Sequence, residues 1–376
     1  MAIDEKRGWA VPEKVYIVIV NWNGWRDTIE CLESVFRIEY PDYQVIVCDN
    51  GSTDGSLDHI KEWAAGRVCA PSSANRVLRH LVTPPVRKPL PFAEYDRTAA
   101  EAGGHAERAG VPLILVDVGT NLGFAGGCNV GMRFALARGD CAYAWLLNND
   151  TVITPDALTA LVSRMQERPD AGQCGSRLLF YDDPTLVQAL GGARYNRWLA
   201  LTRHIGAWTS ANQPIDIADV ESRMDYVIGA SLLVSRSFLI DVGLLEESYF
   251  LYYEEIDWAT RAKGCYGIAY AHDSIVYHKE GRAIGSSSSA AQKSRTADFY
   301  GICNRLRFTR ARHPLALPTV YLGLLVAIAN RLRRHQPERA LDILRIMFSP
   351  RRYSSGAGRK AAAHGSSSSS PLRDAP

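Results

Sequence analysis

The segment VYIVIVNWNGWRDTIECLESVFRIEYPDYQVIVCDNGSTDGS, residues 15–56, indicates the fold class. It opens with Val15–Val20, a continuous run of apolar and mostly β-branched residues that is typical of a strand buried on both faces of a sheet. Asp27–Arg37 follows with apolar residues at helical spacing. Val45–Cys48 predicts a second strand, and Ser56–Ala65 predicts a second helix. This alternation predicts an α/β fold with a doubly wound, mostly parallel sheet.

The alternation continues beyond an interruption at Gly66–Pro112. That segment is rich in Pro, Ala, Arg and Gly, and we expect a surface insertion with little regular structure beyond a short strand at Val77–Val82. Later predicted strands are Leu113–Val116, Ala142–Leu147, Val227–Val234, Gly267–Tyr270 and Ile275–Tyr277. Later predicted helices are the segment that ends near Arg138, Pro155–Glu167, Arg236–Val242 and Glu255–Lys263.

Composition divides the chain into four regions. We expect an N-terminal tail at 1–14, an α/β domain at 15–284 with the insertion 66–112, a basic helical extension at 285–352 and a disordered tail at 353–376. A flexible loop is expected at Gly285–Ala291. The net charge of +3 over 376 residues does not indicate a nucleic-acid partner.

The cysteines and the N-terminus suggest a cytoplasmic protein. None of the eight cysteines forms a CxxC pair, so buried thiols are favoured over a zinc site or disulfides. The first residues, MAIDEKRGWAVPEK, are charged and lack the apolar core of a signal peptide.

The C-terminal extension combines arginines with an apolar run. Leu315–Asn330 is flanked by arginines and is shorter than the roughly 20 residues that a membrane-spanning helix needs. Two interpretations stay open for this run: a core or dimer helix, and an interfacial membrane helix. Its arginine-rich surroundings suggest an anionic surface, first of all the inner face of the cell membrane.

Polar residues follow the first two predicted strands. Ligands in open α/β sheets bind beyond the carboxyl ends of the strands. Asp49 can accept a hydrogen bond from a pyrimidine N–H or a ribose hydroxyl, and the amides of Asn21, Asn23 and Asn50 can serve base carbonyls. The alternative is turn chemistry alone, because Asn and Asp are common in turns.

A glycine-rich segment, NLGFAGGCN at Asn121–Asn129, follows the third predicted strand. Its spacing is not that of a GxGxxG fingerprint. Asn121, Gly123 and Phe124 can let the backbone approach a nucleotide, and helix N-terminal amides favour phosphate. The alternative is tight packing of a turn.

Two strand ends supply candidate metal ligands. Asn148-Asn149-Asp150 closes one strand, with Asp150 as a candidate oxygen ligand for Mg²⁺ or Mn²⁺ and Asn148 near the ribose. His278 ends the run IVYH and is a candidate second ligand, although a lone histidine is more often structural.

A cluster of acids opens the predicted helix near residue 255. Glu254 and Glu255 are adjacent, and mutual repulsion raises the pKa of one of them, as a general base near neutral pH requires. The alternative is a helix N-terminus that carries acids. Asp257 can pair with Arg261 one turn later, which favours a structural role for Asp257.

The order of these motifs resembles the family 2 inverting glycosyltransferases with the GT-A fold. The resemblance covers about Val15–Gly281 apart from the insertion, and the NLGFAGG and NND variants look most like rhamnosyl- and galactofuranosyl-type transferases of bacterial surface polysaccharides. The matching segments are VIVNWNG, VIVCDNGSTDGS, NLGFAGGCNVG, LLNNDTVITPDAL, VIGASLLVSR, FLYYEEIDWATRAKGCYG and VYHKEG.

The resemblance implies a role for each matching position. Asn23, Asp49 and Asn121 would hold the nucleotide. Asp150 takes the place of the last Asp of the DxD motif, whose first position is Asn148 here, and His278 would complete the metal site. Glu255 takes the place of the Asp of an ED pair, the general base. The implied fold is a mixed, mostly parallel sheet flanked by helices, with a C-terminal helical extension.

The predicted function is inverting transfer of a sugar from a nucleoside diphosphate donor to a hydroxyl of a glycan or lipid-linked acceptor. The resemblance favours dTDP-rhamnose, with UDP-sugars next. A sugar nucleotidyltransferase is one alternative, but VNWNGWRD lacks the triphosphate loop that such enzymes usually carry after the first strand. A glycan-binding protein with a decayed site is another, and the joint presence of Asp49, Asp150, Glu255 and His278 argues against it.

Overall fold

The computed structural model describes residues 3–4, 9–10, 13–70, 75–108, 110–280 and 294–348 of the 376-residue chain. The predicted tail 353–376, the predicted loop Gly285–Ala291 and most of the predicted tail 1–14 lie outside these residues. Two short strands, β1 (Ile3–Asp4) and β2 (Trp9–Ala10), form an antiparallel pair before the main domain.

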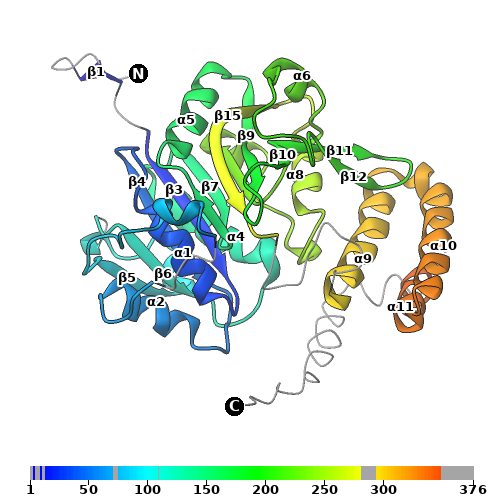
Figure 1. Ribbon diagram of the computed structural model, residues 1–376, viewed down its shortest axis with the longest axis horizontal. Coiled ribbons are helices and arrows are strands. Elements are labelled where there is room, and N and C mark those ends of the chain that lie inside the picture. Colours follow the sequence, from blue (N-terminus) through cyan, green and yellow to red (C-terminus); the bar gives the residue numbers. More distant parts are fainter. Residues whose placement is uncertain are drawn as a thin grey trace.

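A ten-stranded mixed sheet forms the centre of the molecule (Figure 1). Its first half is parallel throughout, and antiparallel pairs enter at β14. In order across the sheet, the strands are β5 (Phe92–Asp96), β6 (Leu113–Asp117), β4 (Tyr43–Asp49), β3 (Val15–Asn21), β7 (Tyr143–Asn148), β14 (Ser231–Ser235), β9 (Ala171–Phe180), β15 (Gly267–His278) and β8 (Thr151–Ile153), with β10 (Val187–Leu190) beside β9.

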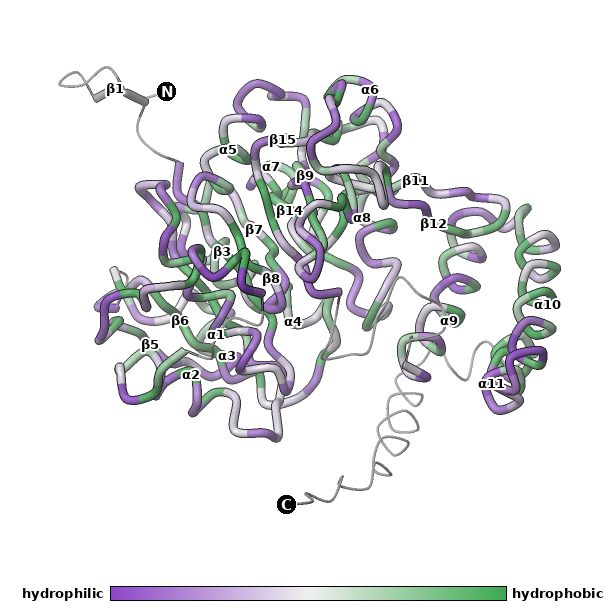
Figure 2. Tube along the Cα trace, in the orientation of Figure 1, coloured by the Kyte–Doolittle hydropathy of each residue, from purple (hydrophilic) through white to green (hydrophobic). Residues whose placement is uncertain are grey.

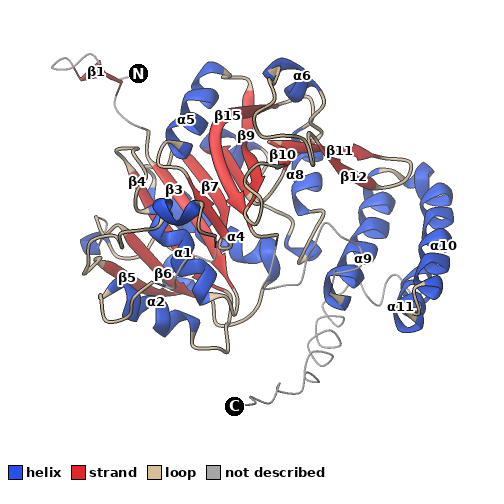
Figure 3. Ribbon diagram, in the orientation of Figure 1, coloured by secondary structure: helices blue, strands red, loops and turns tan. Residues whose placement is uncertain are grey.

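Helices cover both faces of this sheet (Figure 3). One core cluster packs α1 (Trp25–Val35), α2 (Ser56–Ala64) and α5 (Ala157–Glu167) against the sheet. The other face carries α3 (Arg97–Glu101), α4 (Gly123–Arg138), α6 (Ile217–Ser222), α7 (Arg236–Asp241) and α8 (Glu254–Ala262). The continuous apolar runs explain why β3 and β4 are buried on both sides. The predicted doubly wound α/β class is therefore confirmed.

The insertion is more regular than its composition suggested. Leu78–Leu81 forms a short 3-10 helix, so the predicted strand at Val77–Val82 is wrong. Strand β5 adds an edge to the sheet beside β6, with Ala93 and Tyr95 buried and Glu94 exposed between them. This two-residue alternation is the signal of a half-buried strand, and the proline-rich surroundings masked it.

Two further predictions of strands need correction. The single strand predicted at Val227–Val234 is two strands, β13 (Tyr226–Val227) and β14, which belong to different sheets and are separated by a turn at Gly229. The two short strands predicted after Gly267 are one long strand, β15, with a bulge between Ala271 and Ile275. A three-stranded sheet of β11 (Gly192–Asn196), β12 (Leu201–His204) and β13 was not predicted.

The glycine-rich segment is helical rather than a turn before a helix. Helix α4 begins at Gly123. A Cβ on Gly127 would lie 2.8 Å from Val20 Cγ1, and one on Gly131 would lie 2.4 Å from Val18 Cγ1. These two glycines therefore let α4 pack closely on β3.

The C-terminal extension is a bundle of three helices beside the sheet domain (Figure 1). Its helices are α9 (Arg295–Arg312), α10 (Leu317–Arg333) and α11 (Pro337–Phe348). Among the described residues, one helical segment, Pro314–Arg333, is long and apolar enough to cross a membrane by length and composition alone. Only Val320, Leu324 and Ile328 of α10 are buried, so one face of this helix packs on protein and the other is exposed.

Candidate active site

Three predicted site residues end adjacent parallel strands. Asn21 ends β3, Asp49 ends β4 and Asn148 ends β7. Asn21 lies opposite Asp49 in the register, and Val20 lies opposite Asn148. The three residues therefore lie at the same carboxyl end of these parallel strands, where open α/β sheets bind ligands.

Asp49 is held in place by its neighbours. Asn21 Nδ2 donates to Asp49 Oδ2 over 2.7 Å, and the Ser52 backbone N–H donates to Asp49 Oδ1 over 2.9 Å. Asn21 is fully buried, and its Oδ1 accepts a hydrogen bond from Thr28 Oγ1. Asn21 therefore orients the Asp49 carboxylate from within the protein interior. Asn23 is exposed on the turn, and its side-chain oxygen accepts a hydrogen bond from the Thr53 backbone N–H.

Asn50 joins the end of β4 to the start of α4. Its Nδ2 donates to Asn121 Oδ1 over 3.2 Å and to the Gly123 carbonyl over 3.0 Å. Gly123 has a φ of 77°, and a Cβ there would lie 2.3 Å from the Phe250 carbonyl oxygen. The Phe124 N–H donates to that same carbonyl over 2.7 Å, so this helix N-terminal amide binds protein rather than a free anion.

Asp150 and His278 form a close pair. His278 Nε2 lies 3.2 Å from Asp150 Oδ1 and 3.3 Å from Asn148 Nδ2. Antiparallel pairing of β8 with β15, with Thr151 opposite His278, brings these distant residues together. Burial lowers the pKa of His278, but the Asp150 carboxylate outweighs this effect and the net shift of that pKa is upward.

Gln188 orients the His278 ring. Gln188 Nε2 lies 3.0 Å from Glu280 Oε1, and a carboxylate oxygen can only accept, so the amide N–H faces Glu280. The Gln188 carbonyl oxygen then lies 2.9 Å from His278 Nδ1 and accepts its hydrogen. In the neutral ring this tautomer makes the Nε2 lone pair, on the side of Asp150, available to a cation, as a metal-binding histidine requires.

This pair fits a hard divalent cation as two of its ligands. Ligands at right angles and about 2.1 Å from an octahedral cation are about 3.0 Å apart, close to the observed separation of the two atoms. Among the described residues, no group of three or more His, Cys, Asp or Glu side chains could hold a metal ion. A cation that these two side chains hold would need further oxygen ligands, which water or a bound substrate can supply.

Glu254 and Glu255 begin α8 after Tyr253, which has a φ of 76°. Glu255 Oε1 accepts a hydrogen bond from the Gly229 N–H over 3.1 Å. Burial raises the pKa of Glu254 well above its ordinary value, and the Glu255 carboxylate raises it further. Burial also raises the pKa of Glu255. The side chain of Glu255 is half-buried, so part of it remains accessible to solvent.

The loop between β13 and β14 joins the two parts of the site. Gly229 bonds to Glu255, and the carbonyl of the next residue, Ala230, accepts from the Asn148 N–H over 3.1 Å. Asn148 in turn contacts His278. A continuous set of contacts therefore links the acidic start of α8 to the Asp150–His278 pair.

The family follows from comparison with known proteins. Residues 16–78 and 93–215 match the family model described as glycosyl transferase family 2. The chain belongs to family 2 of the glycosyltransferases. The gap between the two matched stretches, residues 79–92, lies inside the predicted insertion. The mixed, mostly parallel sheet that the resemblance implied is present in this glycosyltransferase.

This glycosyltransferase is 26% identical to the N-acetylglucosaminyl-diphospho-decaprenol L-rhamnosyltransferase of Mycobacterium tuberculosis over 201 residues, which are 48% of this chain and 64% of that protein. It is 26% identical to a low-salt glycan biosynthesis hexosyltransferase of Haloferax volcanii over 164 residues, 39% of this chain and 45% of that protein. The match thus spans less than two thirds of the length of these curated relatives.

Solved glycosyltransferase structures are also similar to it. A mannosyltransferase of Pyrobaculum calidifontis in complex with GDP-Man and Mn²⁺ is 14% identical, with a TM-score of 0.46 over 90% of this chain and 89% of that chain. Residues 1–349 of TarS from S. aureus are 13% identical, with a TM-score of 0.45 over 96% and 94% of the two chains.

In this family 2 glycosyltransferase, Asp257 is a structural residue. It is buried and forms ion pairs with Arg261 at 3.0 Å and with Arg312 of α9 at 2.8 Å. The pairing with Arg261 that the helical spacing predicted is confirmed. Asp257 therefore fastens α8 to the C-terminal bundle.

Asn304 of α9 is a further positioning residue that the sequence did not reveal. Its Nδ2 lies within hydrogen-bond distance of three carbonyl oxygens, those of Tyr249, Leu251 and Tyr252, at 2.7, 2.8 and 3.1 Å. The same segment contains Phe250 and Tyr252 with φ values of 62° and 67°. Asn304 thus holds a strained turn directly before the acidic start of α8.

We expect Asn304→Ala to lower the free energy of unfolding by about 1–3 kcal/mol, because buried carbonyls lose their donor. Urea unfolding followed by circular dichroism measures the change. Asn330→Ala, at an exposed position of the neighbouring helix α10, is the matched control and should unfold as the wild type does. Equal unfolding midpoints for the two variants would contradict this role of Asn304.

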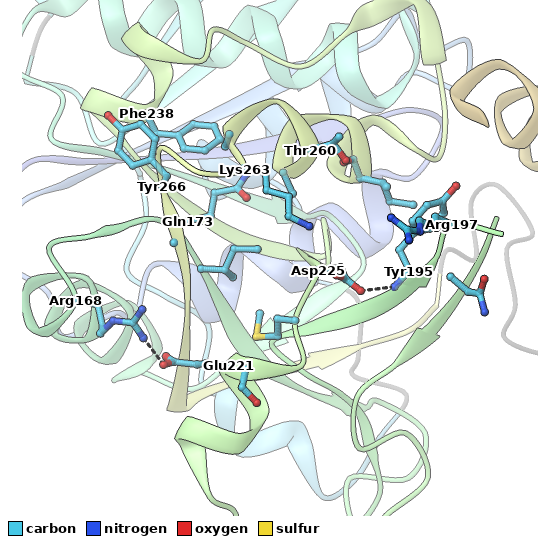
Figure 4. A pocket seen from close by; sticks show the side chains of 18 of the residues that line it. Arg168, Gln173, Tyr195, Arg197, Glu221, Asp225, Phe238, Thr260, Lys263 and Tyr266 are labelled. Carbon is cyan, nitrogen blue, oxygen red and sulfur yellow. Dashed lines mark hydrogen bonds and ion pairs between the residues drawn. The ribbon is translucent and has the colours of Figure 1, made fainter. Parts of the chain in front are cut away.

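A cavity of about 790 Å³ lies away from these residues (Figure 4). It lies between the β11–β12 hairpin, α6, α8 and the start of β15, and none of the predicted site residues lines it. Ion pairs occupy part of its wall, as between Arg168 and Glu221. The cavity is thus separate from the carboxylates and the histidine described above.

Proposed function

We propose that this enzyme transfers a sugar from a nucleoside diphosphate donor to an acceptor hydroxyl with inversion at the anomeric carbon. The observation that carries the proposal is the contact path from Glu255 through Gly229, Ala230 and Asn148 to the Asp150–His278 pair. It supports one site that has both a candidate base and a candidate holder of the diphosphate.

In this proposal Glu255 is the general base. It removes the proton from the acceptor hydroxyl, whose oxygen forms a bond to the anomeric carbon from the side opposite the diphosphate. The bond from the anomeric carbon to the diphosphate oxygen breaks, and its electron pair leaves with the diphosphate. One direct displacement inverts the anomeric configuration, and no covalent enzyme intermediate is needed.

The other predicted residues hold the donor. Asp49, with Asn23 beside it, binds the nucleoside, and Asn50 and Asn121 keep the loops after β4 and β6 together. Asp150 and His278 would hold Mg²⁺ or Mn²⁺. Such a cation stabilises the negative charge of the departing diphosphate. Gln188 keeps the His278 ring in the orientation that this role needs.

The favoured donor is dTDP-rhamnose, and the favoured acceptor is a lipid-linked sugar at the inner face of the cell membrane. Support comes from the branch resemblance and from the name of the mycobacterial relative, a rhamnosyltransferase acting on a diphospho-decaprenol. UDP-sugars are the next candidates. The exposed apolar face of α10 is compatible with a cytoplasmic enzyme that works at a membrane.

A donor screen by thermal unfolding tests the proposal. With Mn²⁺ present, dTDP-rhamnose at about 100 times its Kd should raise the free energy of unfolding by about 2.7 kcal/mol. The same donor with EDTA, and Mn²⁺ alone, are the controls and should give much smaller shifts. No shift with any nucleoside diphosphate sugar would contradict donor binding.

Product analysis separates the alternatives. Release of nucleoside diphosphate that depends on acceptor supports transfer. Exchange of pyrophosphate into the nucleotide sugar would instead indicate a nucleotidyltransferase, and donor binding without turnover would indicate a binding protein. The anomeric configuration of the product, measured by NMR, tests inversion.

A further inference from the structure

The exposed face of α10 is an apolar stripe. Its exposed large hydrophobic residues recur at helical spacing, opposite the face that packs on α9 and α11. With the residue just before the helix, they are Leu315, Leu322, Leu325, Val326 and Leu332. Leu315 is 84% exposed and Leu322 is 64% exposed. In Figure 2 hydrophobic residues run along most of this helix.

The tip of the β11–β12 hairpin carries a second exposed apolar group. Trp198, Leu199 and Leu201 are 49%, 42% and 51% exposed. Figure 1 shows this hairpin reaching from the sheet domain toward α10. A tryptophan and two leucines at a solvent-facing turn indicate a surface that contacts something apolar.

Contacts fix the hairpin tip to the helical bundle. Thr319 of α10 donates to the Trp198 carbonyl, and Arg305 of α9 donates to the Leu199 carbonyl over 2.6 Å. Ala200, between the exposed residues, is buried in the core of the bundle. The tip and the stripe are therefore neighbouring parts of one surface, which we call the docking surface.

The docking surface is positively charged at its borders. Arg197 and Arg203 flank the hairpin tip, and Arg333 and Arg334 end α10. Residues 194–203 and 314–334 contain no Asp or Glu. Apolar side chains bordered by arginines match the charge of an anionic lipid leaflet better than that of a second copy of this basic surface.

We infer that the docking surface binds the face of an anionic lipid bilayer, with the hairpin tip and the stripe of α10 inserted together. Helix α10 lies on the bilayer and does not cross it, because Val320, Leu324 and Ile328 pack against its own bundle. The inference rests on the proposed function, because an enzyme with a lipid-linked acceptor has to reach that acceptor at the membrane.

The docking surface is joined to the candidate base. Tyr253, directly before Glu254 and Glu255, donates from its hydroxyl to the Ala200 carbonyl in the hairpin tip over 2.8 Å. Asn304 ties the same turn to α9. Binding of the surface to lipid therefore holds the acidic start of α8 at a fixed position relative to the membrane.

Co-sedimentation of the full-length protein with vesicles tests the inference. Vesicles of phosphatidylcholine with phosphatidylglycerol should bind the wild type, and pure phosphatidylcholine should bind it more weakly. The hairpin variant Trp198→Ser/Leu201→Ser and the helix variant Leu322→Ser/Leu325→Ser should each bind about tenfold more weakly or worse. The variant Arg197→Gln/Arg203→Gln should lose about fivefold in vesicle affinity per arginine, and only on the anionic vesicles.

The control Val77→Ser/Ile240→Ser removes two residues that are 66% and 62% exposed outside the docking surface, and it should bind as the wild type does. Circular dichroism confirms folding of each variant. Wild-type binding by the hairpin variant would overturn the two-part surface. The inference would also be overturned if the wild type did not bind vesicles but formed a dimer that the same substitutions dissociate. Vesicle binding does not depend on turnover, so failure of sugar transfer would not be mistaken for failure of this inference.

Discussion

Glu255→Gln is expected to reduce sugar transfer by about 10²- to 10⁴-fold while leaving donor affinity unchanged. Gln has nearly the same shape, and its side-chain oxygen can still accept from the Gly229 N–H as Glu255 Oε1 does. It cannot take up the acceptor proton at neutral pH. Steady-state transfer rates and donor titration by calorimetry together separate catalysis from binding.

The controls for this variant identify the base. Glu246→Gln changes an exposed glutamate in the loop before α8 and should keep wild-type rates within a few-fold. Glu254 is 2% exposed, and its Oε2 has no hydrogen-bond partner among the described residues, so Glu254→Gln should cost less activity than Glu255→Gln. Wild-type turnover by Glu255→Gln would remove Glu255 from its role.

The same carboxylates predict the direction of the pH dependence. Burial raises the pKa of Glu255, so its basic form is lost at a higher pH than for an exposed glutamate. The transfer rate of the wild type should therefore fall as the pH is lowered toward that pKa. A rate that stays constant through the acidic range would contradict a glutamate base.

Asp150→Ala is expected to weaken metal-dependent donor binding by at least about 100-fold, since a bound cation contributes several kcal/mol of charge stabilisation. Removal of the carboxylate takes away one of the two ligands that the structure brings together at 3.2 Å. Donor titrations with and without Mn²⁺ measure the effect. Asp156→Ala, at an exposed position six residues later, is the matched control.

A smaller effect is expected for Gln188, which contacts His278 of the Asp150–His278 pair. Gln188→Ala frees the His278 ring to change tautomer and should lower Mn²⁺ affinity by about 10- to 100-fold. An Asp150→Ala variant with unchanged donor affinity in Mn²⁺ would contradict the metal site altogether.

Local patterns were sufficient to predict the parallel strands β6, β4, β3 and β7, but not the edge strand β5. Val15–Val20 and Val45–Cys48 are apolar without interruption, and β3 and β4 are buried on both faces. Polar residues directly after such runs must lie at strand ends, so the edge that gathers Asp49 and Asn148 was predictable. The pairing of Asp150 with His278 was a hypothesis drawn from their places at two strand ends, and the family resemblance supported it.

Residues that act through distant contacts could not be predicted in this way. Gln188 lies in β10, within a region of short strands that showed no clear period. Asn304 lies on a helix whose polar positions look like an ordinary solvated face, and it serves a turn more than 50 residues earlier in the chain. The exposed tip at Trp198 is defined by its packing against α9 and α10.

The central claim is that Asp150 and His278 hold the cation that carries the donor diphosphate beside Glu255. Anomalous diffraction from crystals soaked with Mn²⁺ and the nucleoside diphosphate of the best donor tests it most directly. We expect an Mn²⁺ peak bonded to Asp150 Oδ1, His278 Nε2 and diphosphate oxygens. A peak bound elsewhere, or a diphosphate seated with neither side chain near its cation, would contradict the account.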